Sequence, residues 1–196
     1  DENELRARAR NQIRRKFYQD RLRADLGQAL QLALTDPLTG LYNRRYLMRH
    51  LAGLLAAGQP AELSILLLDV DHFKTVNDRW GHAAGDAALR AIAEMLRMRT
   101  RVFDSLARYG GEEFVVVMPG VGLEEALTAA ERLRAEIATI DFTPMPGIVH
   151  PLTVSIGVAC AESAEATAED VLAAADMALY RAKQAGRDRV AAGTSV

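Results

Sequence analysis

Residues 105–118 read SLARYGGEEFVVVM, and this stretch decides the fold because two strand-like runs flank a pair of glycines. The runs cover residues 105–109 and 114–118, and both have the length and apolar content of strands. Gly110 and Gly111 between them are a hairpin signal, since the favoured two-residue turns need positive φ at both central positions. We therefore predict a hairpin whose turn carries Glu112 and Glu113.

Outward from the hairpin, helical and strand-like patterns alternate along the chain. The run at residues 63–70 is continuously apolar, which predicts a strand that is buried on both faces. The alternation predicts an α/β (α+β) two-layer domain with a central mixed sheet and helices on its faces. The predicted elements beyond the hairpin are helices at about 43–57, 83–98, 123–137 and 168–185, strands at 63–70 and 152–159, and a loop or irregular hairpin at 143–151.

Residues 1–34 differ from the rest of the chain. They contain no proline, and apolar residues recur at steps of three to five amid arginines and glutamates, which predicts an amphipathic helix. Two roles stay open for it: a dimerisation or signalling stalk, or a helix that packs on its own domain. Turn-forming residues at 35–40 predict that the globular domain occupies 35–196. Because the helical pattern is already under way at Asp1, we expect upstream sensor or receiver domains in a longer protein.

Composition limits the classes of function. The 196 residues are 49% hydrophobic with a net charge of −2, so nothing favours binding to nucleic acid. The single cysteine, Cys160, lies in an apolar run and reads as a small core residue, which fits a reducing cytoplasm. No apolar run is long enough to cross a bilayer, and residues 1–16 are too charged for a signal peptide.

Acidic side chains follow the buried strand and occupy the hairpin turn. Asp69 and Asp71 end the strand at 63–70, while Glu112 and Glu113 lie at the turn. Hard cations such as Mg²⁺ prefer such oxygen ligands, and the glycines would let a triphosphate approach the backbone closely. The alternative is an ordinary solvated surface, because acids are common at strand ends and turns.

Two further groups of polar residues have both a functional and a structural reading. Asp86 can accept hydrogen bonds from N1–H and N2–H₂ of guanine but would be repelled by N1 of adenine; its neighbours also suit loop and helix-cap chemistry. Lys183 and Arg187, four residues apart, can share one side of a helix and bind phosphate, although cations at a helix C-terminus are favoured by the dipole alone. Asp86 belongs to a group of candidate site residues that also contains Lys74, Asn77 and His82.

Together these motifs resemble the GGDEF family of diguanylate cyclases, most of all the output domains of PleD-type response regulators. The resemblance runs from Asp36 to Arg187 and is carried by DPLTGLYNRR at 36–45, DVDHFK at 69–74 and GGEEF at 110–114, which ends in Phe114. One departure is Asp188, where the family commonly has asparagine, and we expect little effect on catalysis. The resemblance implies a palm-like nucleotide-cyclase fold and synthesis of cyclic di-GMP from two GTP molecules.

The resemblance also implies roles for individual residues. Asp69, the Val70 carbonyl and Glu113 would hold two Mg²⁺ ions per half-site, with Mn²⁺ as an alternative ion. Glu112 would lie near them and favour deprotonation of the attacking 3′-hydroxyl. The remaining implied substrate contacts are Lys74 on the departing phosphates, Asn77 and Asp86 on guanine, His82 in substrate placement, and Lys183 and Arg187 on the triphosphate.

Each domain of this family binds one GTP, so the resemblance implies a homodimer in which two half-sites face each other. Arg101 and Asp104, at a fixed distance before the turn, resemble the family's product-inhibition site, to which Arg132 would add a contact. Two alternatives stay open. One is a catalytically silent module that binds GTP or cyclic di-GMP and regulates a partner; the other is a GTP-using cyclase with a different product.

Overall fold

The computed structural model describes residues 15, 16, 18, 19, 21, 33–58, 62–163 and 165–196. The chain divides into two units, Asp1–Thr35 and Asp36–Val196. In the first unit, residues 15, 16, 18, 19, 21, 33 and 34 are helical, which agrees with the predicted helix at those positions. The rest of the predicted helix lies outside the described residues, so its role stays a prediction.

The second unit is built on one mixed sheet of six strands in the order β1-β3-β4-β2-β5-β6. The four central strands pair antiparallel, whereas β1 pairs parallel to β3 and β6 parallel to β5. The sequence did not predict the two edge strands, because two and three residues are too short to show an alternating pattern. The strands are β1 (Tyr42–Asn43), β2 (Leu63–Val70), β3 (Ser105–Arg108), β4 (Glu113–Pro119), β5 (Val154–Ala161) and β6 (Val190–Ala192).

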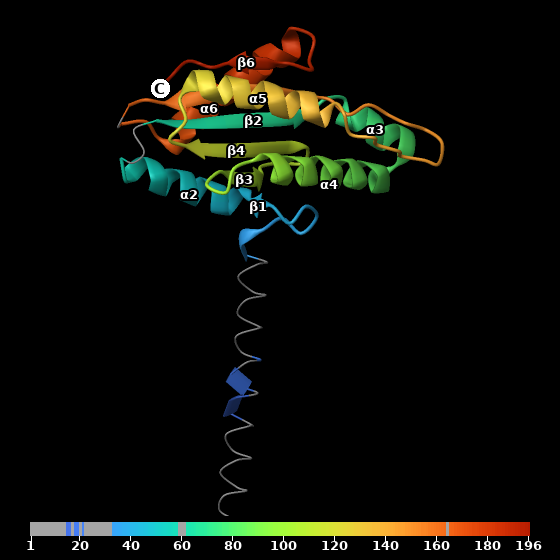
Figure 1. Ribbon diagram of the computed structural model, residues 1–196, viewed down its shortest axis with the longest axis horizontal. Coiled ribbons are helices and arrows are strands. Elements are labelled where there is room, and N and C mark those ends of the chain that lie inside the picture. Colours follow the sequence, from blue (N-terminus) through green and yellow to red (C-terminus); the bar gives the residue numbers. More distant parts are fainter. Residues whose placement is uncertain (1–14, 17, 20, 22–32, 59–61, 164) are drawn as a thin grey trace, which may run out of the picture. The chain divides into compact units, whose positions relative to one another are not determined.

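Helices cover both faces of this sheet (Figure 1). In β4, Phe114 and Val116 belong to one hydrophobic core while Val115 and Val117 belong to the other, because successive side chains point to opposite faces. The mixed sheet flanked by helices is as predicted, but the fold has three layers where the sequence indicated two. Helices α2 (Arg44–Ala56) and α6 (Ala168–Gln184) pack on one face, and α3 (Phe73–Trp80), α4 (His82–Arg99) and α5 (Leu123–Ile137) pack on the other.

Helix α3 was missed from the sequence. It is only eight residues long, and just Phe73 and Val76 are buried, so its apolar period is too short to recognise. It ends at Trp80, its C-cap Gly81 adopts φ 83°, and α4 begins at the next residue, His82. Two helices in direct succession therefore follow β2, and they carry the residues that the sequence analysis assigned to guanine.

Helix α6 is placed close to the sheet by a glycine. Its start is fixed by a capping box in which Thr167 and Asp170 exchange side-chain and backbone hydrogen bonds. A Cβ at Gly157 of β5 would lie 2.1 Å from the carbonyl oxygen of Ala175 and 2.4 Å from the backbone nitrogen of Leu179. Only glycine permits this approach of helix to strand.

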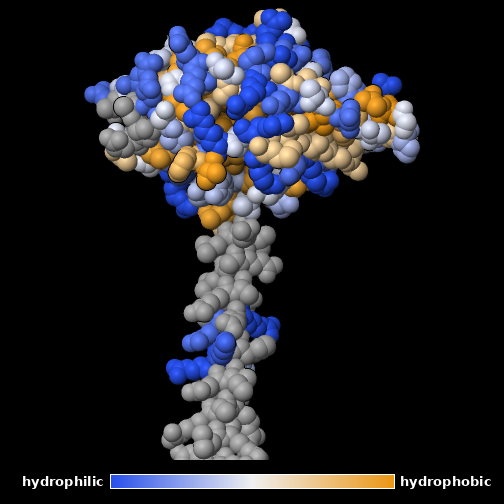
Figure 2. Space-filling view, viewed as in Figure 1, coloured by the Kyte–Doolittle hydropathy of each residue, from blue (hydrophilic) through white to orange (hydrophobic). Residues whose placement is uncertain are grey.

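The structure also tests the predictions for the loop at 143–151 and for Cys160. The stretch 143–151 forms an irregular hairpin with one bridge, Met145 to Ile148, and Cys160 is fully buried, both as expected. On the face in Figure 2, apolar residues of this unit are interspersed with hydrophilic ones. None of the described helices has the length and hydrophobicity needed to span a membrane.

Candidate active site

The hairpin turn lies directly beside the end of β2. The Tyr109 amide donates to the Glu113 carbonyl at 2.8 Å and closes the turn, and the Val70 amide donates to the Glu112 carbonyl at 3.2 Å. Asp69 is the register partner of Glu113, so the two acidic clusters of the sequence meet, as predicted. Glu112 belongs to the turn rather than to β4, which removes the strand alternation that would have sent the two glutamates to opposite faces.

The reason for the paired glycines differs from the prediction. Neither Gly110 nor Gly111 adopts a positive φ, so the expected hairpin turn type is wrong. Instead, a Cβ at Gly110 would lie 2.4 Å from Glu113 Oε2. Gly110 therefore provides the room in which the Glu113 carboxylate folds back over the turn.

Asp69, Glu112 and Glu113 form an acidic cluster in which the charge of Asp69 disfavours ionisation of both glutamates. Burial raises the pKa of Asp69, which is only 7% exposed, and the Asp71 charge adds to the rise. Burial, followed by the negative charge of Asp69, raises the pKa of Glu112 and of Glu113. Such a cluster is stabilised by any cation that reaches it.

Two cations from the C-terminal end of α6 offset part of this charge. The Lys183 ammonium lies 2.9 Å from Asp69 Oδ2, and it lowers the pKa of all three acids against the effect of burial. Arg187, just beyond the helix, also lowers the pKa of Asp69. Lys183 therefore acts on the whole acidic cluster and Arg187 on Asp69, while the predicted binding of the triphosphate by this pair stays a prediction.

The acidic cluster fits a hard divalent cation by its donor chemistry. Mg²⁺ is typically bound by one or two carboxylates together with phosphate oxygens and water. Within the described ranges, no three His, Cys, Asp or Glu side chains are grouped as a ready-made metal cage. The protein ligands would thus be Asp69 and Glu113 with the Val70 carbonyl, and a bound triphosphate would supply the other oxygens.

An arginine that the sequence analysis overlooked ties the turn to the start of the domain. Arg108 donates to the Gly111 carbonyl at 2.6 Å through Nη2 and to both Asp36 carboxylate oxygens at 3.2 Å through Nη1. Burial would raise the pKa of Asp36, but hydrogen bonds from Thr39 and Arg108 outweigh it and the pKa is lowered. No spacing rule links positions 72 residues apart, so only the structure shows this contact.

The residues assigned to guanine lie where α3 meets α4. Asn77 Oδ1 occupies the space in which a Cβ of Gly85 would lie, at 2.0 Å, and Asp86 is the next residue of α4. Asn77 therefore lies beside the turn of α4 that carries Asp86, and their joint role on guanine stays a prediction. Lys74 and His82 lie at the starts of α3 and α4 with exposed side chains, and among the described residues neither side chain makes a hydrogen bond or an ion pair.

The start of α3 adds an anion-binding feature that the sequence analysis missed. His72, the N-cap residue, adopts φ 56° and its side chain does not cap the helix. The Thr75 N–H donates to the His72 carbonyl at 2.8 Å, so the N–H groups of Phe73 and Lys74 are the ones left for another acceptor, and helix N-termini favour phosphate. This helix start immediately follows the strand that carries Asp69.

The predicted feedback residues form a second cluster, at the turn after α4. The Arg101 amide donates to Asp104 Oδ2 at 2.8 Å, and Arg132 acts on Asp104, lowering its pKa against the rise caused by burial. The Arg101 guanidinium pairs with Glu125 of α5, a partner that the sequence did not predict. The three residues are therefore close together, and Arg101 has an internal competitor for any ligand.

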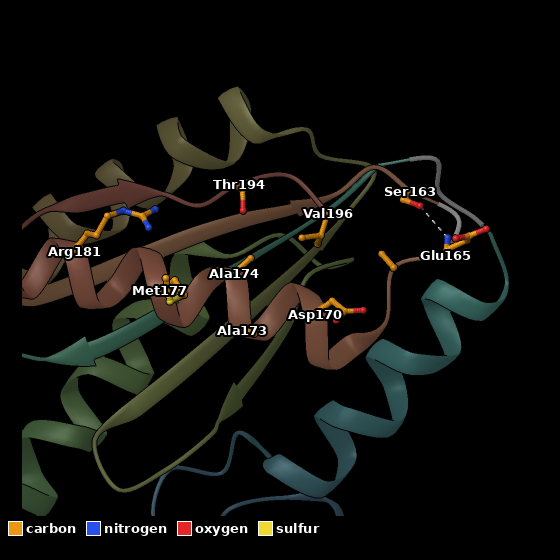
Figure 3. Close-up of a pocket in the computed structure, with 10 residues that line it drawn as sticks. Ser163, Glu165, Asp170, Ala173, Ala174, Met177, Arg181, Thr194 and Val196 are labelled. Carbon is orange, nitrogen blue, oxygen red and sulfur yellow. Dashed lines mark hydrogen bonds between the residues drawn. The ribbon is translucent and has the colours of Figure 1, made fainter.

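Two hollows lie on the α2/α6 side of the sheet. One, of about 370 Å³, includes Glu113, and in it the Arg44 guanidinium stacks 4.5 Å above the centre of the Tyr109 ring. The other, of about 490 Å³, is formed by α6 and the C-terminal residues, with Met177 and Val196 in its lining (Figure 3). The second hollow contains none of the predicted site residues.

Comparison with known proteins follows the same motifs. The family model described as "Diguanylate cyclase, GGDEF domain" matches residues 33–189. The chain is 45% identical over 195 residues to the response regulator PleD of Caulobacter vibrioides, covering 97% of this chain and 42% of that protein. It is 49% identical over 162 residues to the diguanylate cyclase DgcP of Pseudomonas aeruginosa, covering 82% and 24%. The chain thus spans less than half the length of these two relatives.

Solved structures give the same result. The coiled coil and GGDEF domain of DgcB from Caulobacter crescentus, solved in complex with c-di-GMP, matches with a TM-score of 0.85 at 31% identity, covering 96% of this chain and 99% of that one. The active GGEEF domain of a diguanylate cyclase from Vibrio cholerae matches with a TM-score of 0.72 at 29% identity, covering 79% and 98%. The palm-like fold that the motifs implied is the fold of these domains.

Proposed function

The chain belongs to the GGDEF domain family, and from that premise we propose that it is a diguanylate cyclase. Two GTP molecules would be joined by two attacks, each of a 3′-hydroxyl oxygen on the α-phosphorus of the other nucleotide. Each attack forms one P–O bond, breaks the bond to the β-phosphate, and releases pyrophosphate. The observation that carries the proposal is the convergence of Asp69, Glu112 and Glu113 beside Lys183.

The side chains of the site divide the work. Asn77 and Asp86 bind the guanine edge, and this pairing selects guanine because Asp86 only accepts hydrogen bonds. Lys183 and Arg187 bind phosphate oxygens, and Lys74 offsets charge on the departing pyrophosphate. Glu112, whose pKa is raised by burial and by Asp69, is suited to accept the proton of the attacking hydroxyl.

Asp69, Glu113 and the Val70 carbonyl would hold Mg²⁺, with two ions per half-site and Mn²⁺ as a substitute. Bound there, Mg²⁺ would supply charge neutralisation at the α-phosphate. The raised pKa values of Asp69 and Glu113 support this assignment, because an added cation relieves the repulsion between them.

We propose that the active form is a homodimer, since one half-site holds one GTP and the reaction joins two. Residues 1–34 would promote the pairing as a helical stalk, and sensor or receiver domains of the longer protein would control it. A chain shortened to begin at Leu34 should need far higher protein concentration for activity; full activity at low concentration would remove the stalk from this role. GTP as substrate and the single buried Cys160 fit a cytoplasmic location.

We further propose that cyclic di-GMP binds at Arg101, Asp104 and Arg132 and inhibits the enzyme. Arginine pairs readily with phosphate and with the guanine edge. The clustering of these three residues supports the proposal.

The deciding experiment incubates the protein with GTP and Mg²⁺ and separates the products by chromatography. We expect cyclic di-GMP, with loss of at least about 100-fold in rate for Glu113→Ala. Glu169→Ala, which removes a carboxylate from the neighbouring hollow, is the matched control and should keep the rate. GTP binding without product in a demonstrated dimer would instead favour a silent regulatory module, and a different product would favour another class of cyclase.

A further inference from the structure

We infer that Asp71 is a positioning residue that holds the turn Gly186–Asp188 so that Arg187 faces the triphosphate, an inference that rests on the proposed function of this site. Asp71 was grouped with the metal-binding acids in the sequence, but the structure separates it from them. Both of its carboxylate oxygens are taken up by donors from other elements. It therefore serves the site without being a ligand of the cation.

Both carboxylate oxygens of Asp71 accept hydrogen bonds. Oδ1 accepts from the Ser155 hydroxyl at 2.7 Å, and Oδ2 accepts from the Thr153 hydroxyl at 2.9 Å and from the Asp188 backbone N–H at 3.0 Å. Asp71 is 7% exposed, so few other donors can reach it. A buried carboxylate satisfied in this way is fixed in position.

The turn that Asp71 holds has an unusual backbone. Gly186, Arg187 and Asp188 adopt φ of 112°, 62° and 44°, and positive φ is unfavourable for residues other than glycine. Such conformations persist only where the surroundings enforce them. Here Asp71 binds the Asp188 amide from one side, and Arg134 of α5 binds the Asp188 carboxylate at 2.6 Å from the other.

The held turn determines where Arg187 lies. The Arg187 amide donates to the Ala182 carbonyl at 3.1 Å, which anchors the turn to the end of α6, and Arg187 acts electrostatically on Asp69. If the Asp188 amide is released, the strained backbone at Arg187 can relax and the guanidinium leaves the neighbourhood of Asp69. The loss should therefore fall on phosphate binding and leave guanine binding unchanged.

The test compares two nucleotides by isothermal titration calorimetry in the same MgCl₂ buffer: a non-hydrolysable α,β-methylene analogue of GTP, and GMP. Asp71→Ala should raise the Kd of the GTP analogue by about tenfold or more, which is the scale of one charged contact. It should change the Kd of GMP by less than twofold. In an Arg187→Ala background, Asp71→Ala should have no further effect on the ratio. The inference would be overturned if Asp71→Ala weakened the binding of both nucleotides equally. It would also be overturned if Asp71→Ala changed the ratio of the two affinities by the same factor with and without Arg187→Ala.

Two control variants separate position from stability. Ser155→Ala removes only the partner of the other oxygen, so it should lower stability but keep the ratio of the two affinities. Asp71→Asn keeps one oxygen for Asp188 and Thr153 and can donate to Ser155, so it should restore most of the analogue binding. If Asp71→Ala does not fold, Asp71→Ser, whose hydroxyl is too short to reach the turn, replaces it.

A measurement without nucleotide keeps this inference distinguishable from the proposed function. The Asp188 amide of the unmodified protein should exchange slowly with deuterated solvent, because its N–H is bound to a buried carboxylate. Slow exchange that becomes fast in Asp71→Ser supports the link even if no cyclase activity is found. Fast exchange in the unmodified protein overturns it even if the protein is an active cyclase.

Discussion

Gly85→Ala is the substitution whose effect the structure defines most closely. The new Cβ would lie 2.0 Å from Asn77 Oδ1, 3.0 Å from its Cγ and 3.1 Å from Phe73 Cζ. Since real Cβ contacts stay above about 3.0 Å, the Asn77 amide must move by at least about 1 Å. The end of an asparagine side chain can rotate, and alanine is favoured over glycine in a helix by about 0.5–1 kcal/mol, so the protein should still fold.

The expected loss is one hydrogen bond to guanine, about 1.4 kcal/mol, or a roughly tenfold rise in KM for GTP with a smaller change in kcat. Pyrophosphate release at varied GTP concentration measures both constants. In an Asn77→Ala background the oxygen is absent, so Gly85→Ala should then raise KM by less than about twofold. An unchanged KM in the single variant, or an equal rise in both backgrounds, would refute the assignment of Asn77.

Three other predictions concern stability and regulation. Gly53→Ala, in the last turn of α2 with no atom within 4 Å of the new Cβ, should raise stability by about 0.5–1 kcal/mol and Tm by roughly 1–4 °C in thermal melts, without changing activity. The pKa of Asp36 is lowered on folding, so its pairing with Arg108 stabilises above the unfolded pKa and is lost as pH falls through the folded one. Urea melts should accordingly show Asp36→Asn less stable than the unmodified protein at pH 7, with the gap closing below about pH 4. Glu125→Gln should lower the cyclic di-GMP concentration needed for half-inhibition by a few-fold at most, because its ion pair with Arg101 is exposed, whereas Arg101→Ala should abolish inhibition; unchanged inhibition in Arg101→Ala would contradict the feedback site.

The main elements of the fold could be predicted because they carry strong periodic signals. Strand β2 is a continuous apolar run, and its eight residues are all buried, so pattern and structure coincide. The missed elements are short: β1, β6 and α3 depend on neighbours far along the chain rather than on their own sequence. Tertiary pairing, which no local pattern contains, decides such segments.

The candidate site divides in the same way. The acids at 69, 112 and 113 could be grouped from motif spacing, and the register of β2 with β4 brings them together. The supporting contacts could not be predicted, because Arg108 and Asp36 are 72 residues apart and Asp71 and Asp188 are 117 apart. These contacts serve to position the turn and the C-terminal cation, and only the folded backbone shows them.

Gly157 lies outside the candidate site, but substitutions there should reduce activity as strongly as substitutions of site residues. Helix α6 carries Lys183, and its height above β5 is set by a position where any side chain would collide with the helix backbone at Ala175 and Leu179. In a map of all single substitutions scored for cyclase output, Gly157 should therefore behave like a catalytic position although its neighbours are ordinary core residues. Selection for cyclase activity would therefore keep glycine at position 157, because any Cβ there would displace the helix that carries Lys183.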